Sequence, residues 1–115
     1  MSQLHNELNL FQLENLIKNR VPFLFFTLNI EMPVLFDSFD QNYLNSLVHK
    51  VNVADFWDSF NNMNLPKEQA LVIICSTGQN SKEISKLLYH DGYFNSYYIQ
   101  GGLSSLNSKE NPITN

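Results

Sequence analysis

Apolar residues recur at helical spacing near the start of the chain and then gather in a short continuous run. The spacing predicts a helix over Leu10–Lys18, with Asn9 suited to the N-cap and Gln12 three residues further on. Val21-Pro22 interrupts this pattern. Phe23–Leu28 is rich in aromatic residues and lies between turn formers, so it predicts a buried strand.

The middle of the chain carries a weaker pattern. Val34–Phe36 fits either a short strand or a packed loop segment. The elements expected after it are a short helix over Gln41–Leu47, a brief strand at Val51–Val53, helical turns over Ala54–Phe60 and a polar connector over Asn61–Gln69. Phe56, Trp57 and Phe60 are most simply core residues, although a partly exposed cluster there would mark a partner surface.

The pattern is clearest from residue 71 onward. Leu71–Ile74 is continuously apolar, which is typical of a parallel strand buried on both faces. Ser81–His90 predicts an amphipathic helix that ends at Asp91-Gly92. Its inward residues are expected to be Ile84, Leu87 and Leu88, and its outward residues Lys82, Glu83 and Lys86. Tyr97–Ile99 predicts the next strand, which completes a right-handed βαβ unit.

The chain ends on a glycine pair and a polar stretch. Gly101-Gly102 is expected to turn the chain into a short helical segment near Leu103–Leu106, and the tail from Asn107 is expected to be loose. With 115 residues and no linker or repeat, residues 1–115 are predicted to form one α/β domain.

Composition narrows the possible partners and location. The net charge is −4 and the basic residues are scattered, so no nucleic-acid partner is expected. No signal peptide or membrane span is apparent, and the expected location is the cytoplasm. The single cysteine allows neither an internal disulfide nor a multi-thiolate metal site, and no metal or cofactor is predicted.

That cysteine, Cys75, follows the predicted strand at residues 71–74 and precedes a polar loop and a helix. The loop residues, which we predict to bind an anion, are Ser76, Thr77, Gly78, Gln79, Asn80 and Ser81. Backbone N–H groups in such a loop and the start of a helix place partial positive charge around the sulfur. This setting favours the thiolate, the reactive form of cysteine.

Several residues near Cys75 have two possible roles. Ser76 and Thr77 can donate hydroxyl hydrogen bonds to a bound anion, or they are solvated turn residues. Asn80 offers an amide donor, but its spacing from Glu83 favours a capping box. Lys82 is the nearest candidate cation, although a solvent-facing position is the simpler expectation.

The second half of the chain resembles a rhodanese domain. The resemblance rests on the strand, the glycine-containing Cys75 loop, the helix, the turn Asp91–Asn95, the next strand and the Gly101-Gly102 step. It implies a five-stranded parallel α/β sheet with helices on both faces. It also implies sulfur transfer, in which Cys75 would carry a sulfane sulfur as a persulfide. The chain departs from the family at Asn80, where an arginine or lysine is common, and at Thr27–Asn29, which replaces Asp-Val-Arg.

Three functions are compatible with these residues. The first is a sulfurtransferase or sulfur carrier with Cys75 as nucleophile, a protein persulfide or thiosulfate as donor, a thiol or cyanide-type acceptor and a possible protein partner. The second is an inactive rhodanese-like binding or regulatory module, which the missing loop cation supports. The third is a cysteine-dependent phosphatase or arsenate reductase, but its Cys-x5-Arg pattern would need an arginine at Ser81. The first is the sequence-based prediction.

Overall fold

The centre of the fold is a parallel sheet whose order differs from the order of its strands in the chain. The computed structural model describes the backbone of residues 6–110 and the side chains of residues 6–106. The strands are β1 (Glu7–Leu8), β2 (Leu24–Leu28), β3 (Val48–Val51), β4 (Leu71–Ile74) and β5 (Ser96–Ile99). All pairings are parallel, and the strands lie in the order β1-β5-β4-β2-β3.

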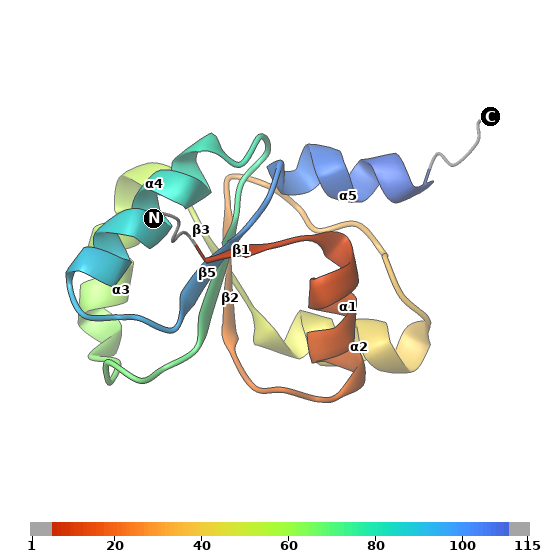
Figure 1. Ribbon diagram of the computed structural model, residues 1–115, viewed down its shortest axis with the longest axis horizontal. Helices are drawn as coiled ribbons and strands as arrows, with labels where there is room; N and C mark the ends of the chain where they lie inside the picture. The colour runs from red at the N-terminus through yellow and green to blue at the C-terminus, as the bar shows by residue number, and fades with distance from the viewer. Residues whose placement is uncertain (1–5, 111–115) are drawn as a thin grey trace.

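Helices cover both faces of this sheet. They are α1 (Leu10–Lys18), α2 (Ser38–Leu47), α3 (Phe56–Met63), α4 (Gln79–His90) and α5 (Gly102–Glu110), with a 3-10 turn at Val53–Asp55. Figure 1 shows α3 and α4 on one side of the sheet and α1, α2 and α5 on the other. Each side has its own hydrophobic core. The predicted five-stranded parallel α/β architecture is therefore confirmed.

The strongest sequence patterns match the structure residue by residue. The predicted bounds of α1 and β4 are those observed. The capping box of α1 is also present, since Asn9 and Gln12 exchange hydrogen bonds of 2.8 Å. Gly92 adopts a φ of +98°, as expected for the residue that ends α4. Val34–Phe36 is a loop segment, which settles the earlier alternative.

Other expectations were wrong in informative ways. The brief strand begins earlier, at Val48, and the chain leaves the sheet at Asn52 to enter the 3-10 turn. On α4, Leu87 is 51% exposed rather than inward. The last helix is longer than the predicted segment near Leu103–Leu106, because α5 continues to Glu110. The rest of the tail that was expected to be loose, residues 111–115, lies outside the described chain. The two-residue strand β1 was not predicted at all.

The aromatic cluster on α3 belongs to the core. Phe56 and Phe60 are buried, and their rings stack with centroids 5.6 Å apart. Phe26 of β2 meets both rings edge-on. Trp57 packs against the same core from a half-buried position. The simpler expectation of core residues is therefore confirmed for Phe56 and Phe60, and Trp57 is half-buried beside them.

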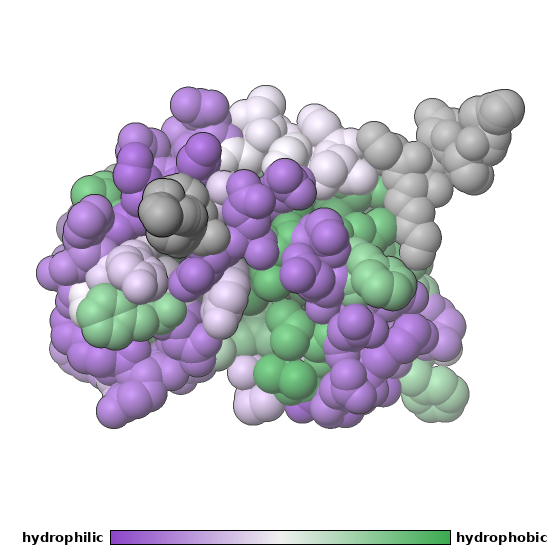
Figure 2. All heavy atoms as spheres, viewed as in Figure 1, coloured by the Kyte–Doolittle hydropathy of each residue, from purple (hydrophilic) through white to green (hydrophobic). Residues whose placement is uncertain are grey.

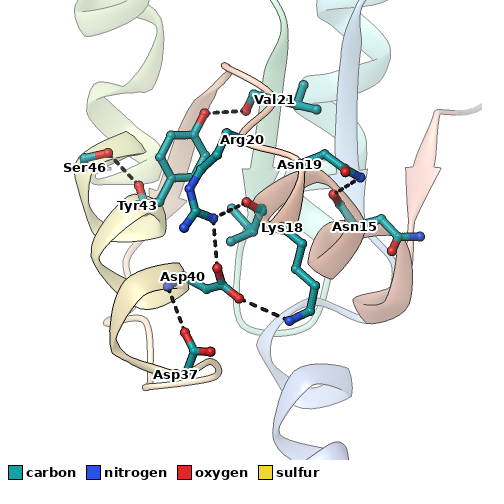
Figure 3. A network of polar contacts seen from close by, with 10 residues as sticks. Asn15, Lys18, Asn19, Arg20, Val21, Asp37, Asp40, Tyr43 and Ser46 are labelled. Carbon is teal, nitrogen blue, oxygen red and sulfur yellow. Dashed lines mark hydrogen bonds and ion pairs between the residues drawn. The ribbon is translucent and has the colours of Figure 1, made fainter.

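A polar network joins α1 to α2 on the opposite face. Asp40 on α2 accepts hydrogen bonds from Arg20 at 2.8 Å and from Lys18 at 3.2 Å (Figure 3). Tyr43, one turn further along α2, donates to the carbonyl oxygen of Val21 at 2.7 Å. These bonds hold the end of α1 against α2 just before the chain enters β2.

We expect Asp40→Asn to lower the free energy of unfolding at neutral pH, because Arg20 and Lys18 lose their shared anionic partner. The Arg20 guanidinium, with help from Lys18, holds the pKa of Asp40 below its ordinary value of 3.8 despite partial desolvation. A carboxyl whose pKa is depressed in the folded state stabilises the fold above about pH 4, and the stabilisation is lost as the pH falls through the folded-state value.

Urea unfolding at neutral pH and in acid measures this difference between the wild type and the variant. The difference should shrink as the pH falls, and a difference independent of pH would contradict the account. Glu31→Gln is the control, because it removes only the exposed partner of Lys50. Its expected effect is within about 0.5 kcal/mol of the wild type.

Candidate functional site

Cys75 follows β4, at the point in the sheet where the connecting helices change from one face to the other. β2 and β4 are neighbours, yet β2 is followed by α2 on one face and β4 by α4 on the other. Crevices at such switch points, outside the carboxyl ends of parallel strands, are where ligands bind in open α/β sheets. The fold thus puts the only cysteine at the position where this architecture usually carries its site.

The Cys75 sulfur faces hydrogen-bond donors of the loop and of the first turn of α4. Its Sγ atom accepts the N–H of Gly78 at 3.1 Å and the N–H of Ser81 at 3.4 Å. The Ser81 hydroxyl oxygen lies 3.5 Å from the same sulfur. The residue is only 3% exposed, so these contacts form in a largely water-free setting. Donors in such a setting interact strongly with negative charge.

The sulfur also replaces the usual helix cap. The N-cap of α4 is Gly78, which has no side chain to accept the free N–H groups of the first turn. Cys75 Sγ accepts the Ser81 N–H, the bond that a capping serine or aspartate ordinarily takes. Asn80, which was expected to cap the helix with Glu83, instead lies inside its first turn and is exposed. That prediction was wrong, because the helix starts earlier than expected.

Opposing effects act on the pKa of the Cys75 thiol. Burial raises the pKa, because it penalises the charged sulfur. The Ser81 hydroxyl, the Ser81 N–H and the N–H groups of Gly78 and Thr77 lower it, and together they outweigh burial. The pKa therefore falls below its ordinary value of 9.0. The groups that lower it most are neutral donors rather than cations.

A second segment, which sequence reasoning did not connect to the site, supports the loop from behind. Leu103 N–H donates to the carbonyl oxygen of Cys75 at 2.9 Å, and Ser104 N–H donates to that of Ser76 at 3.1 Å. The loop and the start of α5 meet at the same edge of the sheet, under a pale surface of weakly polar residues (Figures 1 and 2). The available signal was the glycine pair after β5, since β4 and β5 are parallel neighbours and end at the same edge.

The side chains of the other predicted loop residues form no hydrogen bond to the sulfur within the described structure. Ser76, Thr77 and Gln79 are exposed, and the Gln79 N–H donates to the Thr77 hydroxyl oxygen at 3.4 Å. Lys82 is also exposed, as the simpler expectation had it. Gly78 is buried and has a φ of +93°, and a Cβ there would lie 3.1 Å from the backbone nitrogen of Gly101. The close approach of the two segments therefore requires glycine at this position.

The end of β2 brings no cation to this edge. Thr27 is buried and its hydroxyl has no hydrogen-bond partner among the described residues. Asn29 has a φ of +58° and accepts the Val53 N–H at 2.7 Å, so it ties β2 to the turn after β3. Lys50 on β3 pairs with Glu31 at 2.6 Å.

Two negative findings apply to the part of the chain that the structure describes. No group of three or more potential metal-ligating side chains lies together in this part of the chain. Within the same range, no helix has both the length and the apolar character needed to cross a bilayer.

The chain is similar in sequence to one curated protein and in fold to several solved structures. No protein-family model matches it. Rhodanese-like domain-containing protein 11, chloroplastic, from Arabidopsis thaliana is 30% identical over 86 residues, which cover 64% of this chain. The match spans only 30% of the length of that relative.

The structural likenesses cover most of this chain at low sequence identity. A rhodanese homolog from Thermus thermophilus is 18% identical, with a TM-score of 0.59 over 87% of this chain and 99% of its own. A human single-domain sulfurtransferase is 13% identical, with a TM-score of 0.62 and coverage of 90% and 96%. The polysulfide-sulfur transferase of Wolinella succinogenes is 12% identical, with a TM-score of 0.66 and coverage of 92% and 75%. At these identities the likeness shows the fold. Together with the related Arabidopsis sequence, it shows that the chain has a rhodanese-like fold.

Proposed function

We propose that the domain is a sulfurtransferase or persulfide sulfur carrier with Cys75 as its nucleophile. The observation that carries the proposal is the pair of N–H groups, from Gly78 and Ser81, that donate to Cys75 Sγ. These donors stabilise a thiolate, and the same loop can hold the negative charge of a persulfide. The sulfurtransferase names of the human and Wolinella proteins support this choice of chemistry.

The proposed reaction has two balanced transfers. In the first, the Cys75 thiolate attacks the outer, sulfane sulfur of the donor. A new S–S bond forms, the donor's own S–S bond breaks, and its electron pair leaves as a thiolate from a protein persulfide or as sulfite from thiosulfate. In the second, a thiolate or cyanide attacks the outer sulfur on Cys75. The acceptor leaves as a persulfide or as thiocyanate, and the Cys75 thiolate is regenerated.

The composition of the loop favours a protein persulfide over thiosulfate as donor. Thiosulfate carries two negative charges, and the loop position Asn80 offers no guanidinium or ammonium to bind them. A charge-assisted hydrogen bond of this kind contributes about 1.5–3 kcal/mol. A persulfide presents a single terminal sulfur at the end of a side chain, which also suits a cysteine that is only 3% exposed. A free thiol stays reduced in the cytosol, so we propose a cytoplasmic location.

A binding or regulatory module without catalysis is the second candidate. The observation in its favour is burial, because Cys75 packs in the core cluster that contains Ile73 and Ile84. In that case the thiol would complete the cap of α4 and take no part in chemistry. Loading the protein with sulfur separates the two functions.

The test is intact-protein mass spectrometry after incubation with an inorganic polysulfide, followed by addition of cyanide. We expect the wild type to gain the mass of one sulfur atom on Cys75 and to lose it to cyanide as thiocyanate. The Cys75→Ser variant should gain no sulfur, and any mass that it does gain measures nonspecific adducts. Alkylation after denaturation checks that the Cys75 thiol is intact. If the intact wild type gains no sulfur, the proposed sulfurtransferase function is wrong and the non-catalytic module is the function that the data support.

A further inference from the structure

A cavity that Cys75 does not line lies between α4 and the edge of the sheet. Its volume is about 200 Å³, and most of its wall is apolar. The side chains of Lys82, Lys86 and Tyr89 line it from α4, and those of Asn6, Ser96 and Tyr98 line it from the edge of the sheet. An apolar cavity of about 150 Å³ is large enough for benzene, so this one can take a single aromatic or branched aliphatic side chain.

Hydrogen bonds hold the walls of this cavity in place. The Ser96 hydroxyl donates to the carbonyl oxygen of Ser85 at 3.4 Å, which ties β5 to α4. The Asn6 side chain donates to the carbonyl oxygens of Phe94 and Ser96 at 3.1 and 2.9 Å. Binding there needs little rearrangement, and preformed cavities with a few polar groups are typical of binding sites.

Exposed aromatic side chains extend the apolar surface beyond the cavity. Tyr89 and Phe94 are 43% and 62% exposed, and their rings meet edge-on with centroids 4.8 Å apart. In Figure 2 an apolar patch interrupts the hydrophilic surface beside the end of α4. An exposed aromatic pair next to a cavity is typical of an interaction surface.

The charges around the cavity indicate the sign of the charge that a partner should carry. Lys82 and Lys86 are one helical turn apart, about 6 Å along the axis. Neither forms an ion pair or a hydrogen bond among the described side chains. The other described cations are engaged: Lys18 and Arg20 with Asp40, Lys50 with Glu31, and Lys67 with the carbonyl oxygen of Asp91. The nearby carboxylate of Glu7 accepts the Tyr98 hydroxyl at 2.7 Å.

The cavity, lined by Lys82, Lys86, Tyr89, Ser96 and Tyr98, and the exposed ring of Phe94 beside Tyr89 together form what we call the groove. We propose that this groove binds an acidic segment of a partner protein. An apolar side chain of that segment fills the cavity, and flanking carboxylates pair with Lys82 and Lys86. The charge complementarity is local, because the domain as a whole has a net charge of −4 and repels acidic proteins elsewhere. Residues 1–5, which precede Asn6 in the chain, contain no acidic side chain to pair with the lysines.

The groove also has a defined relation to Cys75. Lys82 directly follows Ser81, whose N–H donates to the sulfur, so a segment bound along α4 would reach the start of that helix next to the loop. The groove could bind a partner protein whether the domain transfers sulfur or is a non-catalytic module. Its test measures binding alone and does not depend on the reactivity of Cys75.

The experiment uses five-residue peptides and amide chemical shifts in NMR spectra of the full chain. The probes are Glu-Glu-X-Glu-Glu peptides in which X is leucine, phenylalanine or tryptophan. We expect saturable shifts at residues 82–90 and 94–98, weaker binding with serine at X, and loss of binding when glutamine replaces the glutamates. The variant Lys82→Ala/Lys86→Ala should bind about fivefold more weakly. Lys50→Ala removes a lysine at the other edge of the sheet and should bind like the wild type.

Three results would overturn the proposal: no saturable binding by any of the three peptides, shifts centred elsewhere, or equal binding by the double variant. Sedimentation of the unliganded protein checks for a second copy as occupant. A dimer of the wild type that dissociates in Lys82→Ala/Lys86→Ala would assign the groove to self-association and also overturn the proposal.

Discussion

Gly102→Ala is expected to displace the Cys75 loop and to lower the free energy of unfolding by about 3 kcal/mol. A Cβ at residue 102 would overlap the carbonyl oxygen of Cys75 and would lie 2.5 Å from the backbone nitrogen of Gly78. Both neighbours are backbone atoms and cannot rotate away. The residue also has a φ of +62°, which side-chain-bearing residues rarely adopt.

The loop displacement should also raise the pKa of Cys75, because the Gly78 N–H that donates to the sulfur lies at the point of overlap. Gly92→Ala is the matched control. Gly92 has a φ of +98°, but a Cβ there would meet only the flexible side chain of Lys67, at 3.5 Å or more. Its expected cost is about 1 kcal/mol, with no change at Cys75. Urea unfolding and thiol titration of both variants measure the difference, and equal behaviour would contradict the proposed support of the loop by α5.

Phe26→Ala is expected to lower the free energy of unfolding by about 3–5 kcal/mol, the usual cost of removing a buried aromatic ring. Phe26 has no exposed surface and contacts the rings of Phe56 and Phe60, so the substitution leaves a cavity between β2 and α3. A loss of this size is comparable to the whole stability of a small domain.

Phe39→Ala makes the same chemical change on α2, where the ring is 78% exposed. We expect its effect to be within about 0.5 kcal/mol of the wild type. Chemical denaturation of the two variants tests the assignment of the α3 aromatic cluster to the core. A small effect at Phe26 would mean that this cluster packs loosely and would reopen its role as a partner surface.

Local patterns in the sequence predicted those elements whose burial repeats regularly. The continuous apolar run of β4 and the helical spacing of α1 gave correct bounds, because every residue of β4 is buried and the buried residues of α1, Leu13 and Ile17, are one helical turn apart. β1 has only two residues, and what defines it is pairing with Tyr98 and Ile99, more than 90 positions away along the chain. No local pattern can carry that information. Leu87 has the right helical spacing, but its side chain is 51% exposed, so spacing alone did not predict its burial.

Part of the candidate site was also predictable. The strand, the loop and the helix around Cys75 follow from the sequence, and so does the presence of N–H donors near the sulfur. The prediction missed that Gly78 starts α4 and that the sulfur takes over the cap, because a capping role was assigned to Asn80 from spacing alone. The contact with Gly102 depends on two parallel strands ending side by side, which only the folded sheet reveals.

The central claim is that neutral donors alone lower the pKa of the Cys75 thiol, without a guanidinium in the loop. The direct measurement is the ultraviolet absorbance of the thiolate as a function of pH, with Cys75→Ala subtracted to remove the tyrosine signal. We predict a midpoint below 9.0 for the wild type, the ordinary value for this thiol, and a higher midpoint for Ser81→Ala, which loses the hydroxyl beside the sulfur. A wild-type midpoint at or above 9.0, or a midpoint that Ser81→Ala leaves unmoved, would contradict the claim.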